Sequence, residues 1–166
     1  MAYIYPAPGV SGQQATLSIS DSSGSLSGTV SIPALQDVTM NAANDVFTWT
    51  QLDSASKLQI ATTATNSLEC NLVLDKDTFF GTGDGAYSSA TTMAAAGIFG
   101  CSTLKTKISF ELYMGDESDG TNGITVSGDG YITGLSPTVS ADQPVWVSPV
   151  TITVDGDYSI DDTATP

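Results

Sequence analysis

The sequence predicts a mainly β protein, a β-sandwich or half-barrel of antiparallel strands with one α-helix at about residues 88–100. Composition is the first reason, because only 13% of the residues are charged and the polar remainder is chiefly Ser, Thr, Gly and Asn. These residue types favour strands, turns and caps over helix surfaces. The second reason is a series of runs in which apolar and polar residues alternate, as the two faces of a strand require. A length of 166 residues suits one domain with its own core.

Short strand-like runs follow one another through the first half of the chain. They cover residues 16–20, 28–32, 36–40, 46–52, 57–61 and 68–74. The first two runs flank a Ser- and Gly-rich turn and are expected to pair as a hairpin. In the run 46–52, Phe47 and Trp49 fall on one face, because side chains two apart in a strand point the same way. Both aromatic residues are candidates for a contact between subunits.

The chain is expected to begin with an extended arm over residues 1–14. Pro6 and Pro8 exclude a regular central strand there. Ile4 and Tyr5 favour an arm that docks on a neighbouring subunit, and a floppy terminus is the alternative. The first nine residues contain no basic start and no apolar core, so no secretory signal is expected, although a mature domain trimmed of its signal fits nearly as well.

The helix expected at 88–100 can begin at a Ser88 or Ser89 cap and end at Gly100. Its small and apolar residues recur at helical spacing and include Ala90, Met93, Ala94, Gly97 and Ile98. No charge lies on the remaining face, which is unusual for a solvated helix. We therefore expect burial on more than one side, against its own sheet alone or also against another chain, with Ala94 as a candidate contact.

Three strands are expected in the last third, at residues 104–114, 124–135 and 150–154. The first alternates cleanly, with Leu104, Ile108 and Leu112 toward the core and Tyr113 on the open face. Trp146, a further contact candidate, precedes the last strand, and Pro149 marks a bulge or an edge there. Asp155 and Gly156 should end this strand. The predicted organisation is a single domain over 15–158 and a short acidic tail over 159–166.

The charge balance excludes several kinds of chemistry. The net charge is −14, from 18 acidic and 4 basic residues, and the chain has no His and no Arg. A surface that grips nucleic acid or an anionic membrane needs clustered cations. Without His there is no Ser-His-Asp or Cys-His arrangement, and Cys70 and Cys101 are too few for a zinc site. We therefore predict no enzyme and no cofactor, and no apolar run reaches membrane-spanning length.

Two acidic loops contain carboxylates that could bind a metal ion. The segment 116–123 resembles a calcium loop, but Thr121 stands at the sixth position and Ser127 at the twelfth, where an EF-hand needs Gly and Glu. A hairpin loop with an Asn-Gly turn explains the segment better. The loop that contains Asp75, Asp77 and Asp84 is equally weak as a metal site. The two cysteines are expected to be buried free thiols, with one disulfide as the alternative.

One order of elements resembles a known family. A strand ending at Asp75 precedes a small-residue helix and an amphipathic strand, and then come Gly-x-Gly-Tyr-Ile-Thr-x-Leu at 128–135, Ser-x-Asp at 140–142 and a last strand ending in a polar-Gly turn. This order resembles the tail tube (major tail) proteins of long-tailed bacteriophages. The resemblance covers roughly residues 65–160 and the first third only loosely.

The resemblance implies a structural virion protein whose subunits form hexameric rings that stack into a tube. It implies a long loop between residues 37 and 66 that contacts the next ring. The implied partners are further copies of the chain, the tape measure, terminator and distal tail proteins, and viral DNA that passes through without tight binding. It implies assembly in the host cytoplasm. The acidic composition suits such a conduit, because an anionic wall repels phosphate groups.

Two other classes of protein remain open from the sequence. A secreted binding module, such as an adhesin or carbohydrate-binding domain, would stack sugar rings on exposed Trp49, Trp146 or Tyr131. Another virion protein with a related fold, such as a head-decoration or tail-terminator protein or the tube of a contractile secretion system, would share the same strand pattern.

Overall fold

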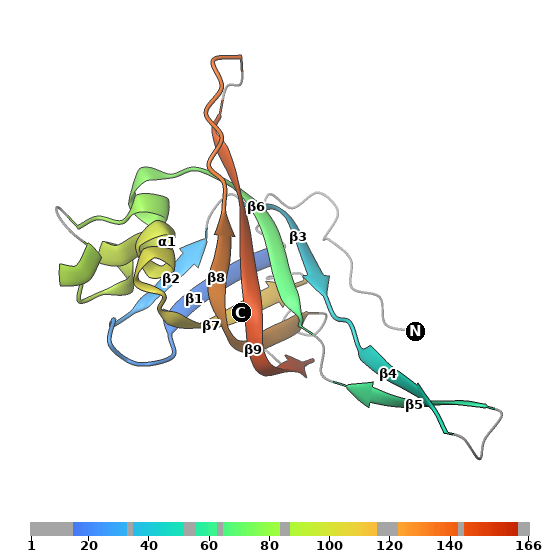
Figure 1. The fold of residues 1–166 in the computed structure, drawn as a ribbon. Coiled ribbons are helices and arrows are strands. Elements are labelled where there is room, and N and C mark those ends of the chain that lie inside the picture. The colour runs from blue at the N-terminus through green and yellow to red at the C-terminus, as the bar shows by residue number, and fades with distance from the viewer. Residues whose placement is uncertain are drawn as a thin grey trace.

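The computed structural model describes residues 15–32, 35–51, 56–62, 65–83, 87–115, 123–142 and 145–162. These residues form a seven-stranded sheet, a separate two-stranded hairpin and a helical layer beside the sheet (Figure 1). Every strand pair is antiparallel. The prediction of a mainly antiparallel β fold with one principal α-helix is therefore confirmed.

The sheet has the strand order β2-β1-β7-β8-β9-β6-β3, and β4 pairs with β5 alone. The strands are β1 (Ala15–Asp21), β2 (Thr29–Ile32), β3 (Leu35–Asn41), β4 (Asp45–Thr50), β5 (Lys57–Thr62), β6 (Ser67–Val73), β7 (Lys107–Met114), β8 (Ile124–Leu135) and β9 (Val147–Asp161). The helical elements are η1 (Lys76–Phe80), η2 (Tyr87–Ser89) and α1 (Met93–Leu104). The predicted first hairpin is confirmed, since Ile19 pairs with Val30.

The long strands β8 and β9 divide the sheet into two halves. Strand β7 pairs with β8 only from Ile124 to Tyr131, and β6 pairs with β9 only from Val147 to Thr153. We call β3, β6, residues 147–154 of β9 and residues 131–135 of β8 the β3 half. We call β2, β1, β7 and the remaining parts of β8 and β9 the β2 half. The two halves run in different directions, so the sheet wraps around its contents as a half-barrel (Figure 1).

The core lies on the inner face of both halves. Alternate residues of the strands are buried there, including Ile19, Leu68, Phe110 and Ile152, each at most 1% exposed. Full burial of one such side chain stabilises the fold by about 1.5–3 kcal/mol. Helix α1 and η1 close the remaining side with Phe79, Met93 and Ile98, which are fully buried. The alternation that predicted the strands therefore also sets which face builds the core.

The strand at 104–114 was predicted too long at its start. Leu104 is the last residue of α1 and is 37% exposed, and β7 begins at Lys107. Lys105 separates them in a left-handed conformation that ends the helix, and its N–H donates to the carbonyls of Cys101 and Ser102. Tyr113 lies on the face away from the core, as its position in the alternation predicts. It is nevertheless only 3% exposed, and its ring lies against Gly123, where an added Cβ would lie 2.3 Å from the ring.

The helix begins four to five residues later than predicted and continues past Gly100. Thr92 caps it, with its hydroxyl oxygen accepting from the Ala95 N–H at 3.1 Å. The predicted caps Ser88 and Ser89 lie instead in the short helical turn η2. Gly100 is a buried residue inside the helix. A cap depends on which side chain reaches the first free N–H groups, and several Ser and Thr residues in this segment have that ability.

Gly97 bends α1 and brings a second backbone against it. Its φ is 65° and its ψ is −179°, so the helix has a non-helical residue in its middle. The carbonyls of Ala94 and Ala95 accept instead from the N–H groups of Thr82, at 3.0 Å, and Gly83, at 3.3 Å. The small residues of the helix therefore do admit a neighbouring backbone, and that backbone belongs to the same chain.

Strand β9 extends further than predicted. It passes through Asp155 and Gly156 and ends at Asp161, with Ser159 paired to Ser127 of β8. The Asp-Gly pair predicted a turn at this point. Instead, the strand continues through register shifts between β8 and β9, and Gly156 has a positive φ of 93°. Pro149 pairs with Asn71 of β6 and lies beyond the last β8 pair, Leu135 with Val150. Pro149 is thus an edge residue on its β8 side only.

Candidate assembly surfaces

The β3 half presents a polar face on the side away from the core. Its outward residues are Asp37, Thr39 and Asn41 of β3, Ser67, Glu69 and Asn71 of β6, Thr151 and Thr153 of β9, and Tyr131 and Thr133 of β8, as the strand registers require. Hydroxyl, amide and carboxylate groups therefore cover this face, and its described residues include no Lys. We call these ten residues the polar wall.

Hydrogen bonds between neighbouring strands hold the polar wall in place. Asn71 Nδ2 donates to Asp37 Oδ1 at 2.9 Å, and Asn41 Nδ2 donates to Glu69 Oε1 at 3.2 Å. The hydroxyl oxygens of Thr133 and Thr153 lie 2.8 Å apart. The carboxylates of the wall thus accept from amides, which keep the negative charge in place without neutralising it.

The β3 half has unpaired strand edges on both sides. No described strand pairs with the outer edge of β3, which is the last strand of the sheet. On the other side, the pairing of β8 with β7 ends at Tyr131. The Ile132 carbonyl accepts from Ser102 Oγ of α1 at 3.4 Å, so the open stretch of β8 starts at Thr133. An edge with free N–H and C=O groups is a template for a strand from another chain.

The opposite end of the sheet is less open. Strand β2 has only four residues, and the segment before α1 already continues its edge. Ser27 N donates to the Thr91 carbonyl at 3.0 Å, and Met93 N donates to the Ser27 carbonyl at 2.9 Å. In the described part of the seven-stranded sheet, the open stretches are the outer edge of β3, the short end of β8 from Thr133 to Leu135, and residues 155–160 of β9, which pair with β8 alone; the first two belong to the β3 half.

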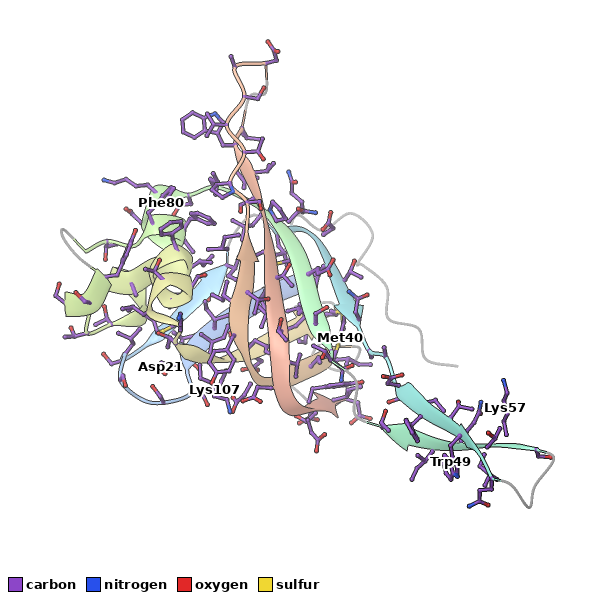
Figure 2. The ribbon with its side chains drawn as sticks, viewed as in Figure 1. Asp21, Met40, Trp49, Lys57, Phe80 and Lys107 are labelled. Atoms are coloured by element: carbon purple, nitrogen blue, oxygen red, sulfur yellow. The ribbon has the colours of Figure 1, made fainter. Side chains whose placement is uncertain are left out.

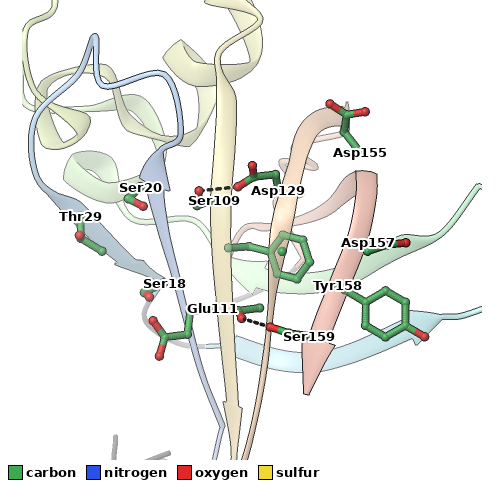
Figure 3. Close-up of a pocket in the computed structure, with 13 residues that line it drawn as sticks. Ser18, Ser20, Thr29, Ser109, Glu111, Asp129, Asp155, Asp157, Tyr158 and Ser159 are labelled. Carbon is green, nitrogen blue, oxygen red and sulfur yellow. Dashed lines mark hydrogen bonds between the residues drawn. The ribbon is translucent and has the colours of Figure 1, made fainter. Parts of the chain in front are cut away.

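The polar face of the β2 half contains a groove lined by hydroxyl and carboxylate groups (Figure 3). Lys107 lies at its rim with Nζ 3.0 Å from Asp155 Oδ2 and 3.7 Å from Asp129 Oδ2. The hydrogen bond with Asp155 raises the pKa of Lys107. Ser109 Oγ donates to Asp129 at 2.6 Å, and this bond lowers the pKa of Asp129. Lys107 is therefore a cation with two anionic partners.

The β4–β5 hairpin projects away from the sheet (Figures 1 and 2). Phe47 pairs with Ile60, and Trp49 pairs with Leu58, so these four side chains share one face. The prediction that Phe47 and Trp49 share a face is confirmed, since their rings stack with centroids 6.0 Å apart. Phe47 is 60% exposed and Ile60 is 56% exposed. This hairpin is an apolar projection whose Phe47 and Ile60 side chains are left exposed by the residues that the structure describes.

A second projection joins β8 to β9. Of its residues, the structure describes 136–142 and 145–146, which we call the β8–β9 tip. Val139, Val145 and Trp146 are 65%, 44% and 52% exposed. The backbone of the tip is anchored at its base, because Leu74 N donates to the Trp146 carbonyl at 2.8 Å. Trp146 is a predicted contact residue, whereas the two valines were not predicted, although the segment between Pro137 and Pro149 is apolar on both faces.

The other predicted contact residues lie on α1 or outside the described residues. Ala94 is exposed on the first turn of α1, away from the two projections (Figure 1). Ile4, Tyr5, Asp84 and the candidate calcium loop at 116–122 lie outside the described residues.

The described residues contain no cluster of metal-binding side chains and no helix that could cross a membrane. No group of three or more His, Cys, Asp or Glu side chains among them could hold a metal ion. Asp75, from the second acidic loop, caps η1 by accepting from Thr78 N at 2.9 Å. Cys70 and Cys101 are buried free thiols. No helix in this part of the chain is both long enough and apolar enough to cross a membrane.

The three aromatic residues weighed for sugar binding do not form one platform. Trp49 lies on the hairpin, Trp146 at the base of the β8–β9 tip and Tyr131 within β8 (Figure 1). Trp49 is half-buried against Phe47. A carbohydrate site that stacks a sugar between or across neighbouring rings needs them side by side.

Comparison with known proteins identifies the fold. No protein-family model matches the sequence, and no curated protein matches it significantly. A chain in the tail of an empty gene transfer agent particle, solved with C6 symmetry, matches with a TM-score of 0.53 and 15% identity over 87% of this chain and 94% of that chain. The SPP1 tail tube matches with a TM-score of 0.58 and 12% identity, over 92% of this chain and 81% of that chain.

A third structure widens the set of assemblies that share this fold. A chain in the extended sheath–tube complex of an extracellular contractile injection system matches with a TM-score of 0.55 and 12% identity, over 95% of this chain and 92% of that chain. The chain therefore has the tail-tube fold, as the resemblance predicted.

Proposed function

We propose that this protein is a tail tube subunit that self-assembles into stacked rings and forms a conduit for genome delivery. The observation that carries the proposal is the β3 half, which combines two open strand edges with a polar, anionic face. A sheet with two free edges can be extended by copies of itself on both sides. The fold adds support, because solved structures that share it come from the tails and tubes of particles.

Ring closure follows from a head-to-tail edge contact. The β3 edge of one subunit pairs with the β8 edge of the next, from Thr133 onward. Such a heterologous contact closes into a ring when the rotation between subunits divides a full turn. Six subunits is the number we propose, since the gene transfer agent tail has C6 symmetry. Closure also removes the free edges, which otherwise favour uncontrolled aggregation.

The polar wall then faces the lumen. Asp37 and Glu69 provide negative charge, and the Ser, Thr and Asn groups offer water-like contacts. Tight binding of DNA depends on Lys and Arg that displace counterions from phosphates. A wall without such groups lets the polymer slide, which is the physical task of a conduit.

The rest of the assembly follows from this role. The protein acts as a structural, non-enzymatic component of the virion tail and is assembled in the host cytoplasm. Its partners are other copies of itself, the tape measure protein that occupies the lumen, and the terminator and distal tail proteins at the two ends.

Crosslinking combined with electron microscopy tests the ring. The variant Thr39→Cys/Thr133→Cys places one thiol on each proposed edge, and a short thiol-reactive crosslinker should produce a ladder of covalent oligomers that ends at six subunits, the symmetry of the related tail. The native thiols give little background, because Cys70 and Cys101 are 2% and 1% exposed. Negative-stain images of the same sample should show rings with a central hole, or tubes.

A matched control separates the edge contact from general association. In Thr39→Cys/Ser18→Cys, the second thiol lies on β1, in the half of the sheet that we place away from the contact. This variant should yield no ladder beyond dimers. A monomeric wild-type protein with no rings at any concentration, or equal ladders from both variants, would contradict the proposed ring.

A further inference from the structure

We propose that residues 2–8 pair as an added edge strand with residues 155–160 of β9 in the same subunit. Such a contact lies within one chain and is independent of the proposed tube. Strand β6 covers one edge of β9 as far as Thr153, and Val154 N donates to the Asn66 carbonyl at 2.9 Å. Beyond Val154, no described strand pairs with this side of residues 155–160, which we call the β9 edge. Open N–H and C=O groups on such an edge can accept a further strand.

The register of the sheet shows which residues of the β9 edge can bond to such a strand. Val154 N points away from β8, and Val154 pairs with Gly130 of β8. The two residues of an antiparallel pair point either toward or away from each other, so Gly130 points away from β9. Gly128, two residues along β8, points the same way. Tyr158 pairs with Gly128, so Tyr158 and, two residues on, Ile160 direct their N–H and C=O groups to the open side.

The side chains of the β9 edge form an apolar face and a polar face. Tyr158 packs against the core, and Ile160, which pairs with the buried Val126, lies on the same side but is 63% exposed. Asp157 and Ser159 lie on the other side, along the groove of the β2 half (Figure 3). A strand that pairs here therefore needs an apolar face beside Ile160 and an uncharged face beside Asp157. A second copy of the β9 edge does not fit, because the acidic side chains of both copies would lie together.

A cleft of about 490 Å³ adjoins the start of the β9 edge. Val154, Gly156 and Asp157 line it on the β9 side. Nothing lies within 4 Å of a Cβ added at Gly156. The rest of the lining comes from the base of the β4–β5 hairpin and the residues before β6, namely Ala43, Asn44, Ala61, Thr62, Thr65 and Asn66. The start of the β9 edge therefore has room for a further backbone and a large side chain.

The sequence of residues 2–8 suits an edge position. It reads Ala-Tyr-Ile-Tyr-Pro-Ala-Pro and contains no charged side chain. Pro6 and Pro8 have no N–H, and because they are two residues apart, both can face solvent on the outer side of an edge strand. Tyr3, Tyr5 and Ala7 then direct their N–H groups to β9. The spacing of the prolines therefore excludes a central strand but permits an added edge strand.

The place of Ala15 sets the direction of the added strand. Ala15 pairs with the end of β7, whose partner on β8 comes directly before the residue that pairs with Asp161. Ala15 therefore lies at the end of the sheet where β9 ends. A strand beyond β9 is four strand spacings from β1, about 19 Å, which residues 9–14 can span at about 3.3 Å per residue. Residues 2–8 then run parallel to β9.

A parallel strand in this orientation matches both faces of the β9 edge. In a parallel pair, a residue that points its N–H to the partner strand lies opposite a residue that points away, and the two share a face. Ile4 and the two prolines therefore lie on the apolar side and cover Ile160. The tyrosine side chains lie on the side of Asp157, whose carboxylate can accept from their hydroxyl groups.

A disulfide identifies the partner strand. The variant Ala7→Cys/Ser159→Cys places one thiol on each strand, on the same face, and mild oxidation of dilute protein should link them within one chain. Mass spectrometry should find the linked peptides in a species of monomer size. Ala7→Cys/Thr39→Cys is the matched control and should not link, because Thr39 lies on β3, at the outer edge of the sheet. Absence of the first link, linkage between chains, or equal linkage in both variants would overturn the proposal.

Hydrogen exchange tests the bonding of the β9 edge in the same dilute protein. The amides of Tyr158 and Ile160 should be protected in the wild type, whereas amides on an open edge exchange freely. Ala7→Pro removes an N–H that we direct to β9 and should make both amides exchange about tenfold faster. Ala2→Pro is the matched control, because the Ala2 N–H faces solvent in the same register as Pro6 and Pro8. Free exchange in the wild type, or no difference between the two variants, would show that residues 2–8 do not pair there.

Discussion

Replacing Gly97 with Ala tests whether close backbone contact holds the helical layer in place. The φ of 65° and ψ of −179° at Gly97 lie in a region that only glycine occupies readily, and forcing another residue into it costs about 1–3 kcal/mol. An added Cβ would lie 2.4 Å from the Gly81 nitrogen and 2.8 Å from the Phe80 carbonyl carbon. Both are backbone atoms, so relieving the overlap costs about 1–3 kcal/mol more.

The expected loss for Gly97→Ala is therefore about 4 kcal/mol, a large part of the roughly 5–15 kcal/mol that stabilises a typical domain. At roughly 2–4 °C per kcal/mol for a chain of this size, Tm should fall by about 8–16 °C. Urea unfolding followed by circular dichroism gives the free energy, and a thermal scan gives Tm.

Gly24→Ala is the matched control, because Gly24 also has a positive φ, 74°, but nothing lies within 4 Å of its added Cβ. This variant should lose only about 1–2 kcal/mol, the cost of the left-handed backbone. If Gly97→Ala is no less stable than Gly24→Ala, the contact between the two backbones does not have the importance that the geometry assigns to it.

Two further predictions concern the wall and the buried thiols. Glu69→Lys should make assembled tubes retain DNA fragments in a salt-dependent way, measured by co-sedimentation, whereas Glu111→Lys on the β2 half should not; equal retention would place the lumen elsewhere. Burial raises the pKa of Cys70 and of Cys101 from 9.0 to about 11. Stability should therefore be complete below pH 9 and fall as pH rises to 11, by up to about 3 kcal/mol per thiol. In the variant Cys70→Val/Cys101→Val, urea unfolding should show no such fall in stability between pH 9 and pH 11. A fall as large as in the wild type would contradict the assignment of this pH dependence to the two thiols.

The strand pattern of this protein was predictable because alternation is a local property. Residues such as Ile108, Phe110 and Leu112 are apolar at every second position, and the structure buries all three. The start of α1 was not predictable in the same way. Ser88, Ser89 and Thr92 are all residue types that cap helices. The helix starts at Met93, whose N–H donates to the carbonyl of Ser27 from a distant part of the chain.

The candidate surfaces were likewise predictable in part, by residue type, and unpredictable in part, by exposure. Phe47, Trp49 and Trp146 were predicted as contact residues from their type and position, and the structure places them on two projections (Figure 1). Their exposure was not predictable, because an aromatic residue in a strand is more often buried in the core. Val139 and Val145 were missed because the segment between Pro137 and Pro149 is apolar on both faces, and such a pattern has no period that singles out an exposed face.

The sequence by itself determined the fold class, the composition of both sheet faces and the absence of arginine and histidine chemistry, since all of these depend on residue type and spacing alone. Only the tertiary structure decided which strands are neighbours, and therefore that β3 and the end of β8 are left with open edges. It also decided that Lys107 lies between Asp129 and Asp155. Strand order and ion pairing join residues far apart in the chain, and local patterns contain no information about which distant segments will meet.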